Sequence, residues 1–580
     1  MRRVLAAILV LSLTAPIVAR AESTATVEMR DDAFSPTVVR VDPGGAVTWV
    51  NRGRNPHNVL ADDASWASPI LQLGESYTQR FPKEGVFPFY CSLHGSAGAG
   101  MVGVVIVGAG IDRYERGNLG GLGSHTRSLP STPPQRPAGG KTIRVPADAP
   151  TIQAAVDRAA PGDVVRIASG VYREAVRVTT PHLTLRGEDR NAVILDGNFE
   201  LMNGIAVFGA DGVVIENMTA RHFLLNGFYW RSVWGYRGSY LTAYGNGDYG
   251  VYAFDSGVGQ FDHSYAAGHP DSGFYIGQCD PCHAVVTNVI ARHNAVGFSE
   301  TNASGDLVVE DSEWSGNMVG IAPNTLDAEA LAPQHGVTIR RNVVRSNHDR
   351  TAPSKPRLYA LFGNGIVIVG GNANEVYDNT VSDHPNAGIA VAPSVDENMW
   401  IGGANHVFRN TVSASGLADL ALIAPVAGGN CFEDNIAATT LPPLLGSSCG
   451  SALAAIGGGD VALLVAGLGR LVRSFGGYLN DWRVEPVPEP QPNMPDVGAP
   501  PVAAGPIEAT TSEADSVDRL APTPLVGNAL ALAYGYAVPL AFLAALALVV
   551  AGRLRRRWLF LPPAAYVAIG IVIFVSGYLS

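Results

Sequence analysis

A repeat of about 23 residues is the feature that most constrains the fold of this chain. A glycine followed by apolar residues recurs six times at steps of 23, 23, 23, 24 and 23, then after 45 residues, and once more after 23. Short strands at a fixed period, without helices between them, are typical of a parallel β-helix whose coils stack about 4.8 Å apart. We therefore predict a parallel β-helix over residues 141–450. The repeat glycines are Gly204, Gly227, Gly250, Gly273, Gly297, Gly320, Gly365 and Gly388.

Other features of this region agree with a stacked solenoid. An Asn or Asp lies nine or ten residues before several of the repeat glycines, where it can hydrogen-bond its neighbour in a ladder, while glycine supplies the positive φ of the corners. A polar insertion, HDRTAPSKPRL, accounts for the 45-residue step. An amphipathic helix over residues 152–160 is expected to cap the open N-terminal end. The ladder candidates are Asn217, Asn288, Asp311 and Asn379.

The N-terminal region has a different pattern. Residues 24–108 alternate apolar and polar side chains in short runs such as AVTWVN and VGVVIVG, separated by turn residues. This period of two predicts a β-sandwich. Residues 110–140 are rich in Gly, Ser and Pro and are expected to form a linker. The first domain is therefore placed at residues 22–109.

Four residues of this sandwich have the side chains of a type 1 copper site. His57 follows the strand AVTWVN, and Cys91 and His94 share the segment FYCSLHG. Met101 opens the last strand. Two imidazoles and a thiolate hold copper in a plane, with a thioether on the axis. Zinc is the alternative, but a structural zinc site requires a fourth strong ligand.

The quoted segments, with AFSPTVVRVDPGGAVTWVN, resemble the cupredoxins of the plastocyanin/pseudoazurin type. The resemblance implies that His57 and His94 are the imidazole ligands, Cys91 the thiolate and Met101 the axial ligand. It also implies one-electron transfer with a redox partner. Six residues, GSAGAG, separate His94 from Met101, whereas four are common in the family. This departure puts the axial bond in doubt.

The repeat region resembles the right-handed β-helix proteins of the carbohydrate-binding and sugar-hydrolase type. It is similar to the periplasmic copper-binding β-helix protein of nitrous-oxide reductase maturation and, more loosely, to mannuronan epimerases and pectate lyases. Such folds host both enzymes and binding modules. Weak catalytic candidates are His263, His269 and Asp271, with Asp262, His293, Glu300 and Asp311 nearby; the alternative is that all are solvated turn residues. Aromatic residues are candidates for stacking on sugars or for internal ladders: Tyr229, Trp230, Trp234, Tyr236, Tyr240 and Tyr244.

The five cysteines raise a separate question, because Cys279-Asp-Pro-Cys282-His283 matches the attachment motif of c-type haem. Aligned on the repeat glycines, this segment falls at a coil corner, where stacked coils leave little room for haem. A corner disulfide or a reduced pair fits better. A second disulfide, Cys431–Cys449, would close the end of the solenoid. Cys91 is then the odd thiol, as a copper ligand must be.

Both termini indicate export and anchoring. Residues 1–21 have the charged start, apolar core and Ala-Arg-Ala end of a signal peptide. Residues 525–580 contain two apolar runs flanking the basic cluster Arg553–Arg557, which predicts a transmembrane hairpin with its turn in the cytoplasm. We expect an amphipathic helix within 451–483 and an extended, unstructured Pro-rich tether at 484–524. The two domains would then lie outside the cytoplasmic membrane, in the periplasm or at the cell surface.

The net charge of −11 argues against a nucleic-acid partner. The leading hypothesis is an exported, membrane-anchored blue-copper protein on a β-helix scaffold. It would exchange electrons with a redox partner protein, or copper with a donor or acceptor. One alternative is an extracellular polysaccharide lyase or epimerase with an accessory cupredoxin. The other is a glycan-binding surface protein without catalysis.

Overall fold

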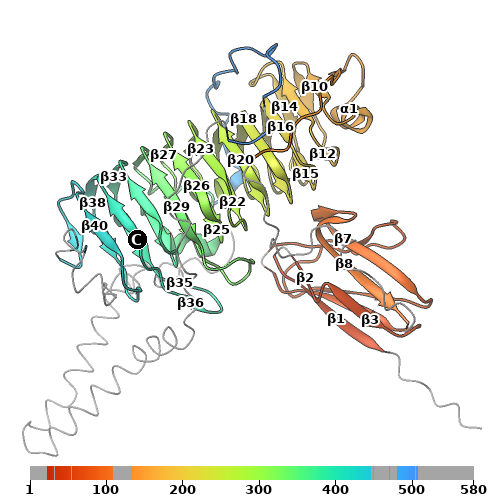
Figure 1. The fold of residues 1–580 in the computed structure, drawn as a ribbon, viewed down its shortest axis with the longest axis horizontal. Coiled ribbons are helices and arrows are strands. Elements are labelled where there is room, and N and C mark those ends of the chain that lie inside the picture. The colour runs from red at the N-terminus through yellow and green to blue at the C-terminus, as the bar shows by residue number, and fades with distance from the viewer. Residues whose placement is uncertain are drawn as a thin grey trace, which may run out of the picture.

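The computed structural model describes residues 23–108 except 32 and 54, residues 132–443, residues 445, 449 and 469, and residues 480–506 except 503. These residues form two mainly β domains, a small sandwich and a long solenoid (Figure 1). The predicted combination of a cupredoxin-like sandwich and a parallel β-helix is confirmed. The sandwich lies beside the solenoid, on the side of β15, β22 and β25.

The N-terminal sandwich consists of two four-stranded sheets around an aromatic core. Trp49 is fully buried, and its ring lies 5.1 Å from that of Phe89 and 6.4 Å from that of Phe81. The first sheet contains β2 (Phe34–Ser35), β1 (Thr24–Met29), β4 (Ala46–Asn51) and β6 (Ser76–Arg80). The second contains β3 (Val38–Val41), β8 (Ala99–Val107), β7 (Gly85–Ser96) and β5 (Leu60–Ala61). The alternation of apolar and polar residues thus predicted this domain correctly.

The solenoid has three parallel sheets, and most coils contribute to all three. Sheet 1 contains β12 (Val176–Val178), β15 (Ile205–Phe208), β17 (Phe228–Arg231), β19 (Val251–Phe254), β22 (Ser272–Gly277), β25 (Val296–Thr301), β28 (Val319–Asn324), β31 (Ile366–Val369), β34 (Ala387–Ala392), β39 (Ala418–Leu422) and β41 (Thr440–Leu441). Sheet 2 contains β9 (Thr142–Val145), β10 (Val164–Ile167), β13 (Thr184–Gly187), β16 (Val213–Arg221), β18 (Trp234–Tyr244), β20 (Gly257–Asp262), β23 (Ala284–Thr287), β26 (Ser304–Glu310), β29 (His335–Arg340), β32 (Glu375–Tyr377), β37 (His406–Phe408) and β40 (Cys431–Glu433). Sheet 3 contains β11 (Gly170–Tyr172), β14 (Val193–Asp196), the ends of β16 and β18, β21 (Tyr265–Ala267), β24 (Ile290–Arg292), β27 (Glu313–Ser315), β30 (Val343–Arg345), β33 (Thr380–His384) and β38 (Thr411–Ser415).

Short elements complete the solenoid. Helix α1 (Ile152–Arg158) lies at the N-terminal end, where Ile152, Ala155 and Val156 are buried. The side chain of Thr151 caps this helix by accepting a hydrogen bond from the Ala154 N–H. The other elements are the two-stranded pair β35 (Ser394–Val395) and β36 (Met399–Trp400) and the 3-10 helices η2 (Pro356–Leu361) and η4 (Trp482–Val484).

The repeat glycines serve close packing and not, as expected, left-handed corners. None of the eight has a positive φ. A Cβ on Gly204 would lie 2.4 Å from the carbonyl oxygen of Gly227, and one on Gly227 would lie 2.7 Å from that of Gly250. Any side chain here would push successive coils apart. Positive φ at coil corners is adopted instead by residues such as Asn217, Asn288 and Asp311.

Buried asparagines do form ladders, but mostly at other positions than we expected. In one ladder the amide oxygen of Asn317 accepts from the Asn294 backbone N–H at 3.0 Å, and Asn347 repeats this contact with Asn317. His269 and His384 occupy positions in the same ladder. Of the four predicted ladder residues, Asn379 bonds to its neighbours in this way. Such ladders satisfy buried backbone groups at the coil corners.

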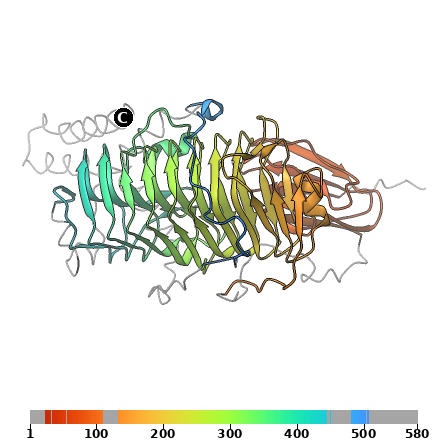
Figure 2. The same cartoon turned by 90° about the horizontal axis from the view of Figure 1, so that it is seen from above.

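The segment after the solenoid is ordered where we expected an unstructured tether. Residues 480–506 are extended but docked on the β-helix, and Figure 2 shows them in blue crossing its strands. Trp482 is buried against Phe199, with ring centroids 5.6 Å apart. Backbone groups of Gln491 exchange hydrogen bonds of 2.8 and 2.9 Å with the Asn191 side chain. The prediction of a free tether is therefore wrong for this part, because side chains of the β-helix satisfy its backbone.

Several expectations lie outside the described residues. These are the signal peptide at 1–21, most of the linker, most of the amphipathic helix at 451–483, residues 507–524 and the hairpin at 525–580. Within the residues that the structure describes, no helix is long and apolar enough to cross a membrane.

Candidate metal centre

The first ligand, His57, is held in the loop between β4 and β5. It forms a two-way backbone bridge with Leu71, with hydrogen bonds of 3.1 and 2.7 Å. The side chain of Asn51 supports the same loop by donating to the carbonyl oxygens of Asn55 and Leu71, each at 2.9 Å. These contacts hold His57 in a fully buried position.

The register of β7 and β8 explains how the hairpin formed by these two strands supplies three candidate ligands, Cys91, His94 and Met101. Tyr90 pairs with Val102 and Gly95 with Gly100, so the four residues from Cys91 to His94 face the single residue Met101. A bulge of this kind turns side chains away from the regular ladder. The six-residue spacing between His94 and Met101 is taken up by the tight hairpin after His94. The longer spacing therefore leaves Met101 opposite the bulge, where it is 1% exposed.

Two imidazoles and one thiol converge in the sandwich. The Nδ1 atoms of His57 and His94 lie 3.8 and 3.4 Å from the sulfur of Cys91. All three side chains are buried, and Cys91 is the free cysteine in the described part of the chain. Two nitrogen donors and one soft sulfur donor at these separations match the strong ligand set of a type 1 copper site.

Burial determines the protonation states of the three side chains to which a metal would bind. It lowers the pKa of His57 to about 4, with a smaller opposing effect of Asp31, and lowers the pKa of His94 well below its usual value. Both imidazoles are therefore neutral at pH 7 and can offer a lone pair. Burial raises the pKa of the Cys91 thiol, so metal binding displaces a proton from the sulfur.

Asn58 links the two ligand loops and was missed in the sequence. Its backbone N–H donates to the Cys91 sulfur at 3.5 Å, and its side-chain oxygen accepts from the Ser92 N–H at 2.8 Å. Hydrogen bonding around a ligating sulfur is one way in which proteins tune a copper site. In the sequence, the only indication of this role is that Asn58 directly follows His57.

Comparisons with known proteins agree with this geometry, which defines a cupredoxin-type copper-binding domain. The family of copper binding proteins of the plastocyanin/azurin type matches residues 21–108, and the right handed beta helix region matches residues 226–404. The N-terminal domain belongs to the plastocyanin/azurin family. Because the donors fit and this family binds copper, the cofactor is one copper ion.

Individual relatives align with a stretch about as long as the first domain. Chloroplastic plastocyanin of Tetradesmus obliquus is 38% identical over 85 residues, 13% of this chain and 57% of that protein. Plastocyanin of Scenedesmus fuscus is 33% identical over 85 residues, 13% of this chain and 85% of that protein. A purple cupredoxin from Nitrosopumilus maritimus is 28% identical, with a TM-score of 0.13, covering 14% of this chain and 98% of its own.

The three weak catalytic candidates of the β-helix have separate sets of contacts. His263 is paired with Asp262 at 2.9 Å. His269 lies in the asparagine ladder, where its Nδ1 is 2.8 Å from the Asn294 oxygen and burial lowers its pKa to about 4. Asp271 accepts from the Lys355 ammonium at 2.9 Å. The described contacts do not assemble the three into one site.

The other β-helix candidates differ in their contacts. Glu300 is buried without a hydrogen-bond partner for its carboxyl oxygens among the described residues, and desolvation raises its pKa. His293 is paired with Glu485 of the docked segment, and Asp311 with Arg341 at 2.7 Å. Among the aromatic candidates, Tyr229, Trp230, Tyr236 and Tyr244 are at most 2% exposed. Trp230 and Tyr236 belong to the internal core of the solenoid and Tyr229 to a separate buried aromatic cluster, and none of the four offers an open face to a sugar.

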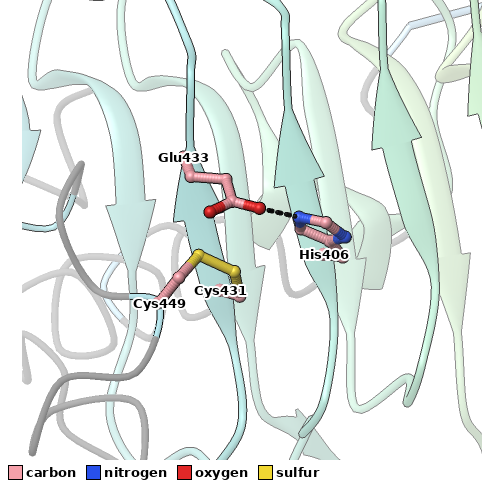
Figure 3. A group of neighbouring side chains, drawn as sticks. All are labelled: His406, Cys431, Glu433 and Cys449. Carbon is pink, nitrogen blue, oxygen red and sulfur yellow. Dashed lines mark hydrogen bonds and ion pairs between the residues drawn. A yellow bond between two sulfur atoms is a disulfide. The ribbon is translucent and has the colours of Figure 1, made fainter.

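The remaining cysteines are bonded in pairs. The CDPCH segment lies at a coil corner, and Cys279 is joined to Cys282. At the far end of the solenoid Cys431 is joined to Cys449, beside His406 and Glu433, which lie 2.9 Å apart (Figure 3). These four side chains are close enough to surround a metal. Because the two sulfurs are bonded to each other, the group lacks the thiolates that a metal would need.

Proposed function

We propose that this protein is a one-electron carrier with a type 1 copper centre. The observation that carries the proposal is the buried convergence of His57, Cys91 and His94 on one point. Copper in such a site changes between Cu(I) and Cu(II). The sandwich resists rearrangement of its ligands, because His57 is fixed by Leu71 and the Cys91 segment by Asn58. Little reorganisation accompanies the change of charge, which favours fast transfer.

Met101 is proposed as the axial ligand. Its position opposite the Cys91–His94 bulge and its burial support this role. A redox partner protein is proposed as the source or acceptor of the electron. The described contacts of His263, His269 and Asp271 do not bring these three side chains together, so they give no support to a sugar lyase or epimerase.

A redox titration of the copper-loaded full chain tests this function. We expect the visible thiolate–copper band to bleach with one electron per copper and to return fully on reoxidation. Copper that leaves the protein on reduction would contradict electron transfer and favour copper handling instead.

We further propose that the chain is exported through residues 1–21 and anchored by a hairpin at 525–580, with both folded domains outside the cytoplasmic membrane. The apolar composition of these segments and the basic cluster Arg553–Arg557 support this topology. Protease added to intact cells or spheroplasts should digest both domains. Full protection of both domains, while a known exposed protein is cut, would contradict it.

A further inference from the structure

The copper-site end of the sandwich is covered by sheet 1 of the β-helix. Leu225, at a corner of the solenoid, is 8% exposed and belongs to the same apolar cluster as Cys91 and Leu93. Met202 packs against this cluster from the preceding coil, and the Leu225 N–H donates to its carbonyl oxygen at 2.8 Å. The core around the copper ligands therefore continues across the domain boundary.

Polar contacts fix the same interface beside the ligands. Arg177 of β12 donates a hydrogen bond to the carbonyl oxygen of Gly95, the residue after His94. Its guanidinium lies 5.7 Å from the ring of Tyr90, the residue before Cys91, and 4.6 Å from that of Phe208. One β-helix side chain thus touches both ends of the ligand segment.

A second arginine of sheet 1 lies beside Gly100, the neighbour of Met101. Arg231 of β17 is 2% exposed, and its Nε would be 3.2 Å from a Cβ on Gly100, the neighbour of Met101. Its guanidinium lies 5.0 Å from the ring centre of Phe254. This packing keeps the cation close to the ligands and away from bulk water.

We propose that the β-helix is a built-in lid on the copper centre, and that Arg231 is a tuning residue that raises its reduction potential. This inference rests on the proposed function. Reduction removes one positive charge from the centre, so a nearby cation stabilises the reduced form. The effect is screened little because the interface excludes water and salt. The lid also covers the His94 side of the site, where Arg177 contacts Gly95, and would hinder direct contact by a protein-sized partner.

The reduction potential of full-length variants tests the tuning role. We expect Arg231→Gln to lower the potential and Arg231→Lys to restore most of it, because the lysine keeps the charge. Arg186→Gln is the matched control, since Arg186 is a buried arginine paired with Glu216 at 2.6 Å on sheet 2. We expect this control to affect stability and leave the potential unchanged. An unchanged potential in Arg231→Gln, with copper bound, would overturn the tuning role.

Electron exchange with a protein-sized oxidant, cytochrome c, tests the lid. Leu225→Asp places a charge in the shared apolar cluster and should open the interface. Oxidation of the reduced centre should then become at least about tenfold faster, with the thiolate–copper band retained as evidence of an intact site. An unchanged rate of oxidation in Leu225→Asp would overturn the proposal that the β-helix covers the copper centre. If the copper of the unaltered protein cannot be reduced and reoxidised, the proposed function itself is contradicted.

Discussion

The two domains encode their properties in opposite ways. In the sandwich, a few residues at fixed spacings carry the chemistry, and changing Cys91 should remove it. In the β-helix, the period is repeated over many coils and carries the fold, while the polar residues singled out in its sequence form no common site in the described contacts. A motif defined by ligand types therefore predicts function, whereas a motif defined by period predicts architecture. Replacements of cysteines in both domains, of two asparagines and a histidine in the β-helix, and of Met101 in the sandwich test this contrast.

The largest difference is expected between the cysteines. Cys91→Ala should abolish the visible thiolate–copper band completely, because no other cysteine in the described part of the chain has a free thiol. The paired change Cys279→Ala and Cys282→Ala should retain the full band, since this disulfide lies in the β-helix. Absorption spectra after copper loading measure both. Retention of the band in Cys91→Ala would contradict the ligand assignment.

The asparagine ladder is expected to give the largest stability effect. The Asn317 side chain donates to the carbonyl oxygen of Ala291 and the amide oxygen of Asn347, and accepts from Asn294. Asn317→Ala leaves these buried groups unpaired and should lower the free energy of unfolding by about 3 kcal/mol.

Asn288→Gly is the matched control for the ladder. Asn288 is exposed and has a φ of 53°, which glycine adopts without strain. Urea unfolding should show a change below about 1 kcal/mol for this variant. Equal losses of unfolding free energy in the two variants would mean that a ladder asparagine stabilises the β-helix no more than an exposed asparagine does.

Acid should weaken the β-helix through His269. Its folded pKa of about 4 lies below the value of 6.5 for an exposed histidine, so the unfolded chain binds the proton more readily. Stability is then fully present above pH 6.5 and falls as the pH drops towards 4, by about 3 kcal/mol. His269→Asn, which suits the ladder, should remove this part of the loss. Identical pH profiles of unfolding for the two proteins would refute this explanation.

The smallest effect is expected at the axial position. Met101→Leu should keep copper bound by the three stronger ligands. It should raise the reduction potential, because losing a donor destabilises Cu(II) more than Cu(I). A potential equal to that of the unaltered protein would mean that Met101 is not a ligand.

Sequence patterns predicted both architectures and the copper ligand types, because strand alternation and coil period are local properties. They did not predict the contacts made by residues far apart in the chain. Arg177 and Arg231 lie in ordinary coil positions, and only the docking of the two domains brings them to the copper site. The Pro-rich segment shows the same limit, since its order comes from Asn191 and other distant partners. The predicted role of the repeat glycines was wrong. Glycine is required at these positions because the neighbouring coil lies too close for a side chain, and not because the backbone has a positive φ.

A metal analysis of the purified full chain, with its absorption spectrum, tests the single copper centre of the first domain. We expect one copper per chain and an intense visible band from the Cys91 thiolate. A chain without copper after loading, or one that shows a haem band from the Cys279–His283 segment, would contradict it.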